Sequence, residues 1–287
     1  MGVQIMKIAP LQLDATGIKR YSKLLRTCFP ATPSKAGKFS EASLIWLYTK
    51  NPEGLAIGFD AFDDGELVAH YVCIPTTITG ATGPVKALLS LNTATAPQHQ
   101  GKGLFTQLAR ATFAVATQQG FSCVYGVANQ NSTPGFVQKL GFNLVAPLEA
   151  RIGIGRLQPP QPNSSLQFQR SWNIAALNWR CTNPANPIRA WQHASSSVFV
   201  ANTGYPLIAA YDELWGTVFS TQPFGAHQLQ LKIIVGLFPQ GIPSTYFRIP
   251  NFLKPSPLNF IFKSLVPTVT TPERHAVHFT FLDFDAY

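Results

Sequence analysis

The chain has 287 residues, of which 46% are hydrophobic and only 12% are charged, and its formal net charge is +9. The hydrophobic share is large enough for a packed core and excludes an intrinsically disordered chain, and the length suits two domains or one large one. The positive charge favours an anionic ligand, such as a nucleotide or a phosphorylated cofactor. The lysines and arginines are scattered without a basic run or a recognition motif, which argues against nucleic acid as a partner.

The four cysteines are expected to be reduced and mostly buried, because they form no C-x-x-C pair and no histidine lies at a zinc-ligand spacing from them. We therefore predict no metal site. The first ten residues lack the apolar core of a signal peptide, and the longest apolar runs, such as residues 233–238, are too short to span a bilayer. These features favour a cytoplasmic protein without a membrane span.

The N-terminal part predicts, in order, a strand at residues 5–8, helices at 18–28 and 40–48, and hairpin strands at 55–62 and 66–75. Asp14 and Ser40 are suitable N-caps for the two helices. The hairpin is predicted because an Asp-Gly pair lies between two apolar runs. Residues 31–38, which follow Pro30 and contain Pro33 and Gly37, predict a loop between the helices.

A glycine-containing loop comes next. Residues 85–96 form a mostly apolar run that predicts a strand, and residues 104–119 repeat apolar side chains at helical spacing. Between them, residues 96–105 read A-P-Q-H-Q-G-K-G-L-F. The two glycines let the backbone turn sharply and approach a ligand, while the helix N-terminus and Lys102 supply positive charge. The segment predicts an anion cradle, most naturally for phosphate, with an ordinary strand-to-helix turn as the alternative.

A second polar loop follows about thirty residues later. Residues 124–128 predict a short strand, residues 128–136 read A-N-Q-N-S-T-P-G-F, and residues 137–142 read V-Q-K-L-G-F. The order of elements is helices, antiparallel strands, then strand, loop, helix, strand and helix. That order predicts an α/β (α+β) fold with a mixed sheet flanked by helices.

The two loops together resemble the Gcn5-related N-acetyltransferase (GNAT) superfamily. Its pyrophosphate loop, [RQ]-x-x-G-x-[GA], aligns with residues 100–105, where Phe105 replaces the last small residue; a literal match also starts at Gln98. The resemblance covers roughly residues 57–148 and implies an acyl-CoA-dependent N-acyltransferase without a metal. The residues that it implies for cofactor binding are Thr93, Ala94, Thr95, Gln100, Gly101, Lys102, Gly103, Leu104, Phe105, Asn129, Asn131 and Phe136.

The resemblance also implies direct attack of an amine on the thioester, which calls for a general base. The family often places a thiolate-protonating tyrosine where this chain has Val137, so that acid is missing. His70, within an apolar strand, is the candidate base, with a structural histidine as the alternative. Asn92 is the other candidate catalytic residue, as a group that orients water. Asp60 is a possible carboxylate base but is expected at the surface, and His99 is expected to be solvated in the loop.

The second half predicts a separate unit. Residues 144–157 form a strand that ends a first domain (1–157), and residues 158–165, rich in proline and small polar residues, form a linker. Strands are predicted in the C-terminal domain (166–287) at 197–200, 207–211, 228–238, 244–248, 258–262 and 277–281. Residues 46–52 (W-L-Y-T-K-N-P) and 179–184 (W-R-C-T-N-P) are alike. This is either chance or a sign that the smaller α/β second half is a degenerate GNAT copy, which would have lost the cofactor because no Q-G-K-G follows residue 165.

A combination of scattered pieces resembles the two-domain bacterial N-acyltransferases of surface-polysaccharide and lipopolysaccharide biosynthesis. These include the tryptophan motifs just described, residues 128–136 and the terminal D-F-D-A-Y. The resemblance implies acyl transfer from acyl-CoA to the amine of a nucleotide-linked amino sugar, with the C-terminal domain contributing to the acceptor site. The alternatives are another small amine or peptide as acceptor, or a non-catalytic acyl-CoA-binding module. A homodimer is left open.

Overall fold

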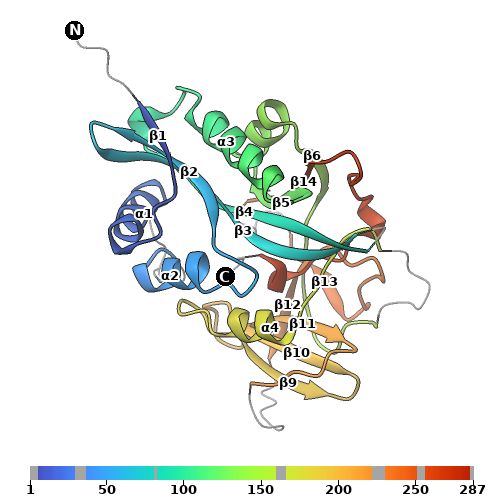
Figure 1. Ribbon diagram of the computed structural model, residues 1–287. Coiled ribbons are helices and arrows are strands. Elements are labelled where there is room, and N and C mark those ends of the chain that lie inside the picture. Colours follow the sequence, from blue (N-terminus) through green and yellow to red (C-terminus); the bar gives the residue numbers. More distant parts are fainter. Residues whose placement is uncertain are drawn as a thin grey trace.

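The computed structural model describes residues 6–29, 37–80, 83–159, 166–221, 230–250 and 256–284, and it contains two mixed sheets (Figure 1). The first sheet has β1 (Lys7–Pro10), β2 (Ile57–Asp63), β3 (Glu66–Gly80), β4 (Gly83–Thr95), β5 (Cys123–Asn129), β14 (Leu258–Ser264) and β6 (Asn143–Pro147) in this order, with β8 (Gln169–Arg170) beside β3. The second sheet has β13 (Tyr246–Arg248), β7 (Glu149–Gly153), β12 (Leu231–Gly236), β11 (Ile208–Trp215), β10 (Ser196–Asn202) and β9 (Arg189–His193). The predicted fold class, a mixed sheet with helices and a second smaller α/β unit, is confirmed.

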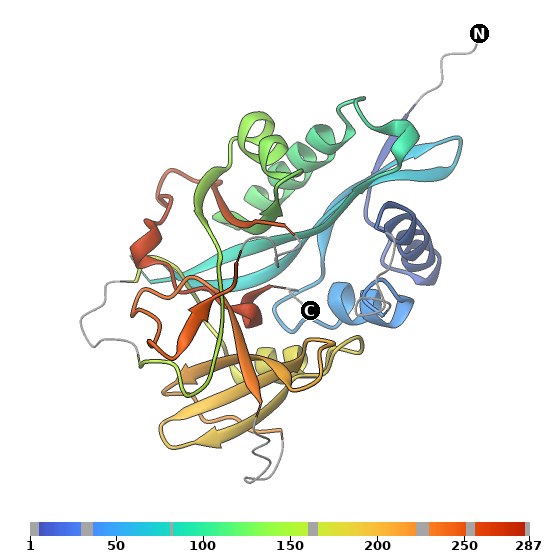
Figure 2. The ribbon, with the colours of Figure 1, turned by 180° about the vertical axis from the view of Figure 1, so that it is seen from behind.

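Helices cover both faces of the first sheet. They are α1 (Ala15–Cys28), α2 (Glu41–Thr49), α3 (Leu104–Gln118) and the π-helix η3 (Gly135–Lys139), and α4 (Ile174–Cys181) packs on the second sheet (Figures 1 and 2). Neighbouring residues of β3 point to opposite faces. Tyr71 therefore packs against Phe113 of α3, whereas His70 stacks on Tyr21 of α1. Short 3-10 turns are η2 (Pro97–His99), η5 (Arg274–Ala276) and η6 (Phe281–Asp283).

The two helix caps predicted in the N-terminal part are present. The carboxylate of Asp14 accepts a hydrogen bond from the Gly17 amide at 2.8 Å, and the Ser40 hydroxyl accepts one from the Ser43 amide at 3.2 Å. Each cap satisfies an amide that the first helical turn leaves without a partner. The second helix therefore begins where the sequence predicts, while the first begins at Ala15, three residues before the predicted start.

The six strands of the second sheet have the same order and the same directions as six strands of the first, from β2 to β6. In the first, β2, β3 and β4 are antiparallel neighbours, β4 and β5 are parallel, and β14 is antiparallel to both β5 and β6. In the second, β9, β10 and β11 are antiparallel, β11 and β12 are parallel, and β7 is antiparallel to both β12 and β13. The second sheet thus repeats the first, which favours an internal repeat over a chance likeness of the two tryptophan motifs.

Each sheet contains an inner strand from the other half of the chain, in addition to the short β8 beside β3. β7 follows β6 in sequence but lies between β12 and β13, and β14 follows β13 but lies between β5 and β6. Residues 144–157, predicted as one strand, therefore form parts of two strands in different sheets. The boundaries at 157 and 165 stay a prediction, and residues 160–165 of the predicted linker lie outside the described residues, as do 285–287 of the terminal motif.

The two tryptophan motifs contact each other. The Trp46 and Trp179 rings stack with their centroids 4.7 Å apart, and each indole N–H donates to the other residue's carbonyl oxygen, at 2.9 and 3.1 Å. The asparagine of each motif then accepts a hydrogen bond from the amide two residues later: Asn51 from Glu53, and Asn183 from Ala185. The matching contacts place the two halves around an approximate twofold relation.

The main core belongs to the first sheet but is completed by the second half of the chain. Phe168, Phe260 and Phe279, all fully buried, pack in it with Tyr125 of β5. Residues 277–281, predicted as a strand, instead make isolated bridges and lead into η6. Within the described residues no helix is both long enough and apolar enough to cross a membrane.

Candidate active site

The first sheet opens where β4 and β5 part. The two strands pair only over residues 87–90 and 123–126. Beyond this point β4 has a bulge, because Leu91 pairs with Val72 and Ala94 pairs with His70, so that Asn92 and Thr93 together oppose one residue of β3. Asn92 adopts a left-handed backbone conformation with φ 46°. A bulge bends and twists its strand, which turns the end of β4 away from β5.

A cavity of about 340 Å³ lies at this opening. It is lined by the end of β4, the glycine loop and the first turn of α3, together with the loop before η3 and the C-terminal end of α1. The lining includes Cys28, Thr93, Ala94, Thr95, His99, Gln100, Gly101, Gly103, Leu104, Phe105, Asn131 and Phe136. The walls thus come from both loops that the sequence singled out.

The glycine loop borders the cavity with a row of backbone N–H groups that have no hydrogen-bond acceptor among the described residues. Gly101 and Gly103 have φ values of 77° and 75°, a conformation that favours glycine, and α3 begins directly after them. Within the described residues, none of the backbone N–H groups of residues 101–106 donates a hydrogen bond to a protein acceptor. Such amides at the positive end of a helix bind anions. The geometry therefore fits the predicted anion cradle.

Most of the predicted cofactor residues line the cavity, and two do not. Residues 93–95 of β4 and Asn131 do so. Lys102 is exposed and lies outside the lining. Asn129 also lies outside it, and its side-chain oxygen accepts from the amides of Asn131 and Ser132 at 3.0 and 2.9 Å, which shapes the turn. The cofactor roles of all these residues stay predictions.

The departure at Phe105 has a packing explanation. Its ring packs edge-on against Phe136, with the centroids 5.0 Å apart, and covers Gly135, where an added Cβ would lie 3.3 Å from the ring. The large side chain thus fills space over a glycine instead of closing the loop. Val137, in the register of the missing tyrosine, cannot donate a proton.

His70 and Asn92 do not line the cavity, but Tyr48 joins them. The Tyr48 hydroxyl lies 3.2 Å from His70 Nε2 and accepts from Asn92 Nδ2 at 3.1 Å. His70 Nδ1 lies 2.7 Å from Asp60 Oδ1, and the Tyr21 hydroxyl donates to Asp60 Oδ2 at 2.7 Å. The expectation that Asp60 is a surface residue is wrong, since it is fully buried. The hairpin register pairs it directly with His70.

The expectation that His99 is solvated is also wrong. Its Nε2 lies 2.8 Å from Asp63 Oδ2, and its side chain is 11% exposed. Two buried atoms of the cavity lining, His99 Nδ1 and Thr93 Oγ1, have no hydrogen-bond partner in the part of the chain that the structure describes. Unpaired buried polar atoms are costly, so a bound ligand is the simplest source of partners for them.

The corresponding opening of the second sheet is filled by the chain itself. β11 and β12 pair over only three residues before they part, and η6 contacts both strands. Leu237 and Phe279 exchange backbone hydrogen bonds of 2.7 and 3.1 Å, and the Thr280 hydroxyl donates to the Asp212 carboxylate. Backbone comes so close that a Cβ on Gly236 would lie 1.9 Å from the Phe279 carbonyl oxygen. This packing leaves no room for a ligand beside Gly236.

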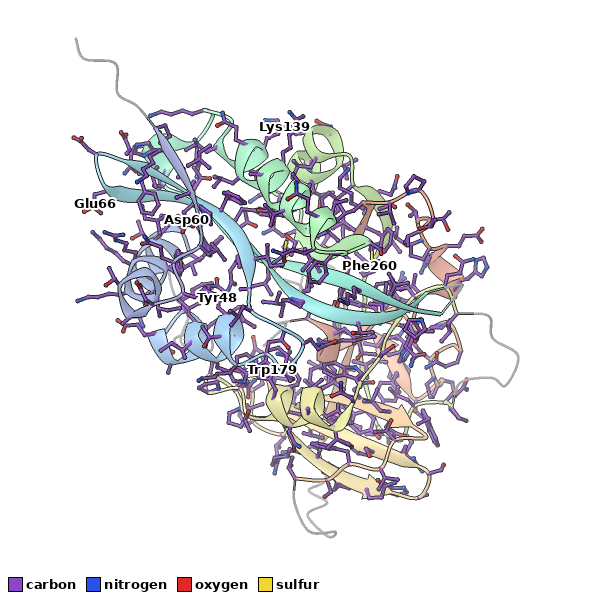
Figure 3. All side chains as sticks on the ribbon, in the orientation of Figure 1. Tyr48, Asp60, Glu66, Lys139, Trp179 and Phe260 are labelled. Atoms are coloured by element: carbon purple, nitrogen blue, oxygen red, sulfur yellow. The ribbon has the colours of Figure 1, made fainter. Side chains whose placement is uncertain are left out.

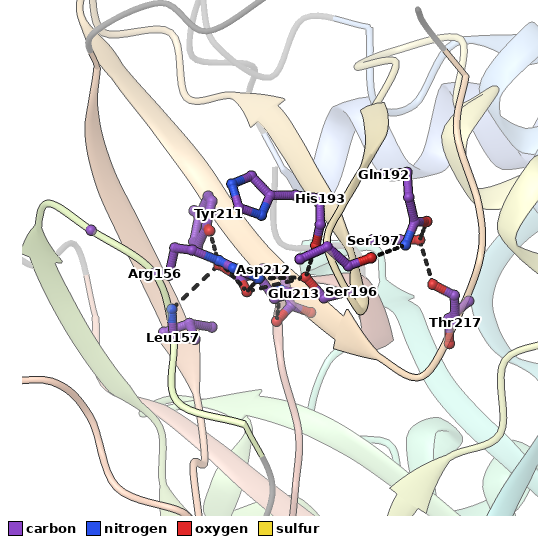
Figure 4. Close-up of polar contacts among 12 residues, drawn as sticks. Arg156, Leu157, Gln192, His193, Ser196, Ser197, Tyr211, Asp212, Glu213 and Thr217 are labelled. Carbon is purple, nitrogen blue, oxygen red and sulfur yellow. Dashed lines mark hydrogen bonds and ion pairs between the residues drawn. The ribbon is translucent and has the colours of Figure 1, made fainter. Parts of the chain in front are cut away.

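The other face of the second sheet carries an ion pair between the partly exposed Arg156 and the buried Glu213 (Figure 4). Arg156 Nη2 donates to Glu213 at 2.9 Å and to the Ser196 hydroxyl at 2.7 Å, and the Tyr211 hydroxyl also donates to Glu213. Burial raises the pKa of Tyr211, and the neighbouring Glu213 charge adds to this effect. The cluster fastens the segment that leaves β7 to strands β10 and β11. Among the described residues no group of His, Cys, Asp and Glu side chains could hold a metal ion.

Comparisons with known proteins agree with the fold and the loops. Residues 11–145 match the family described as "Acetyltransferase (GNAT) domain". None of the curated proteins matches the sequence. A probable N-acyltransferase from Enterococcus faecalis V583 is similar in structure over 91% of this chain and 73% of its own, with 9% identity and a TM-score of 0.61.

Two further solved structures are similar. Eis1 from Mycobacterium abscessus has a TM-score of 0.58 and 10% identity over 91% of this chain and 74% of its own. A tandem GNAT protein from the clavulanic acid biosynthesis pathway has a TM-score of 0.52 and 9% identity over 92% of this chain and 99% of its own. At these identities the likeness concerns the fold. Residues 11–145, which include the cavity lining and both loops, therefore match the GNAT acetyltransferase domain family.

Proposed function

We propose that the protein transfers an acyl group from acyl-CoA to an amine. The observation that carries the proposal is the row of backbone amides at residues 101–106, which donate to no acceptor among the described residues and lie along a cavity between parted strands. A pyrophosphate supplies the acceptor oxygens that such amides need. The edge of β4 that has parted from β5 offers backbone groups to an extended chain such as pantetheine, because residues 93–95 line the same cavity.

The proposed chemistry is direct attack. The amine nitrogen adds to the thioester carbonyl carbon, the new C–N bond forms as the C–S bond breaks, and coenzyme A leaves as a thiolate. A thiol has a pKa of about 8.5, so the thiolate is a competent leaving group near neutral pH. For that reason the valine at position 137 is compatible with transfer.

A nucleotide-linked amino sugar is the proposed acceptor, and another small amine is the alternative. Two features support the first choice: the net charge of +9, which suits a diphosphate, and the second unit beside α2, which adds surface next to the first domain. We assign the second unit a part in holding the acceptor. Its own cofactor opening is filled, so one acyl-CoA per chain is expected.

Release of free thiol from acetyl-CoA and longer acyl-CoAs tests the proposal. The acceptors are a panel of nucleotide-linked amino sugars, aminoglycosides and simple amines. Thiol release that depends on one amino sugar, with the N-acyl product found by mass spectrometry, is the expected result. Thiol release with only a simple amine would overturn the proposal that the acceptor is a nucleotide-linked amino sugar. Binding of acetyl-CoA without thiol release for any acceptor would overturn the proposal of acyl transfer.

A further inference from the structure

Four polar side chains are buried together between the first sheet and helices α1 and α2. Asp60 and His70 lie on β2 and β3, Tyr21 on α1 and Tyr48 on α2, and none is more than 1% exposed. Tyr48 and Asp60 are labelled in this layer in Figure 3. Burial of a carboxylate and an imidazole is costly unless their hydrogen bonds are satisfied. Here the bonds between them form one continuous chain.

The chain of bonds has a defined direction. Both Asp60 oxygens act as acceptors, one from Tyr21 at 2.7 Å and one from His70 Nδ1 at 2.7 Å. With a proton on Nδ1, the neutral imidazole presents the Nε2 lone pair, which accepts from the Tyr48 hydroxyl at 3.2 Å. Carboxylate, imidazole and hydroxyl thus occur in the order of a Ser-His-Asp triad, with a phenol in place of the serine.

The chain of bonds leads to the place where the sheet opens. Asn92 donates to the Tyr48 hydroxyl at 3.1 Å and is itself partly exposed. It lies in the bulge of β4, directly before Thr93, which lines the cavity. A left-handed conformation is unfavourable for a residue other than glycine, and such strain is concentrated at functional sites.

We propose that Asp60, His70 and Tyr48 form a proton relay that takes up the proton of the acceptor amine. The proposal rests on the proposed acyl transfer. As the nitrogen attacks the thioester, its proton passes through a water held by the Asn92 amide to the Tyr48 oxygen, while the Tyr48 proton passes to His70 Nε2. Asp60 stabilises the imidazolium, and the proton then returns by the same route to solvent.

Tyr21 offers a matched control for Tyr48. Both hydroxyls are buried and both bond to the network, but Tyr21 lies on the far side of Asp60 from Asn92. Its ring stacks on His70 at 4.3 Å, and burial together with the Asp60 charge raises its pKa, so it remains a donor. The groups that face His70 are Asp60 from β2, Tyr21 from α1, Tyr48 from α2 and, through Tyr48, Asn92 from β4.

The test compares Tyr48→Phe with Tyr21→Phe in steady-state kinetics across pH, with acetyl-CoA affinity measured by calorimetry. Loss of a proton acceptor costs typically about 10²–10⁴-fold in rate. We expect Tyr48→Phe to lower kcat at least about 100-fold, to flatten its dependence on pH and to keep the acetyl-CoA affinity. Tyr21→Phe should keep kcat within about threefold, even if it lowers the melting temperature as much as Tyr48→Phe does.

Asp60→Asn serves as the second variant if Tyr48→Phe does not fold, and it should show the same loss of kcat at unchanged acetyl-CoA affinity. Equal kcat values for Tyr48→Phe and the wild type, or equal losses in the two tyrosine variants, would refute the relay and leave acyl transfer standing. An inactive wild type that binds acetyl-CoA would refute acyl transfer and the relay with it.

Discussion

Phe260→Ala probes the exchanged strand, because this residue of the second half completes the sheet that carries the candidate active site. Phe260 is fully buried, pairs with Val127 and Ala146 of the flanking strands, and packs its ring against Phe168 and Phe279 at centroid distances of 4.9 and 4.8 Å. A buried Phe→Ala change costs roughly 3–5 kcal/mol. Total stabilities are typically about 5–15 kcal/mol, so this loss is roughly a fifth or more of a typical value.

Urea unfolding measures this loss. It is followed by tryptophan fluorescence, which reports mainly on the second unit, and by acetyl-CoA binding, which reports on the first sheet. Because each sheet contains a strand of the other half, we expect one shared transition that moves to lower urea for both signals. Phe247→Ala is the control: Phe247 is 70% exposed on β13, and its loss should cost less than about 0.5 kcal/mol. A loss below about 1 kcal/mol for Phe260→Ala, or two separate transitions of which only one moves, would refute this reasoning.

Three further predictions concern the cavity, the strand exchange and pH. Acetyl-CoA should protect Cys28 from alkylation, because this half-buried thiol lines the cavity. Cys123 should stay unreactive in both cases, because burial raises its pKa to about 12. Equal labelling of Cys28 with and without acetyl-CoA would contradict the placement of the cofactor in this cavity. A fragment of residues 1–157 lacks β14 and should fold only when residues 166–287 are added, as judged by circular dichroism; independent folding contradicts the exchange. Burial lowers the pKa of His278 from 6.5 to about 4. Between pH 6.5 and pH 4 this imidazole is protonated in the unfolded state but not in the folded state, so the free energy of unfolding falls as the pH falls. His278→Gln should remove up to roughly 3 kcal/mol of this dependence in urea titrations, and an unchanged dependence contradicts the assignment.

The sequence predicted the glycine loop well because its chemistry is local. Gly101 and Gly103 set the backbone, and the apolar spacing after them sets α3. Each of these signals lies within about twenty residues, where turn and helix rules apply. The class of fold and the two loops of the candidate site followed from them.

The relay and its burial were not predictable in the same way. An unbroken hairpin would place Asp60 opposite Ala69 and on the other face from His70. A bulge between Ala61 and Phe62 shifts the register by one residue, and Asp60 then pairs with His70. The mixed composition of the hairpin gives no sign of this shift. Tyr48, on α2, reaches the same place only through tertiary packing.

The strand exchange is the other feature that local patterns do not reveal. The strand predicted at residues 258–262 is present as part of β14, but the strands that pair with it lie more than a hundred residues earlier in the chain. Pairing at that distance depends on the whole sheet, while propensity describes only the strand itself. The likeness of the motifs at Trp46 and Trp179 was the one sequence sign of the repeat, and their contact gives it physical content.

Titration calorimetry of acetyl-CoA with Gly103→Asp and Gly120→Asp tests most directly that the glycine loop holds the cofactor. Both glycines have positive φ, at 75° and 82°, so both variants carry the same kind of backbone strain, but only Gly103 lies at the cavity. A carboxylate about 5 Å from a phosphate charge costs about 3 kcal/mol at an effective dielectric constant of about 20, or roughly 100-fold in affinity. We expect one acetyl-CoA per chain for the wild type and Gly120→Asp, and loss of binding for Gly103→Asp. Unchanged affinity in Gly103→Asp, or two sites in the wild type, would contradict this assignment.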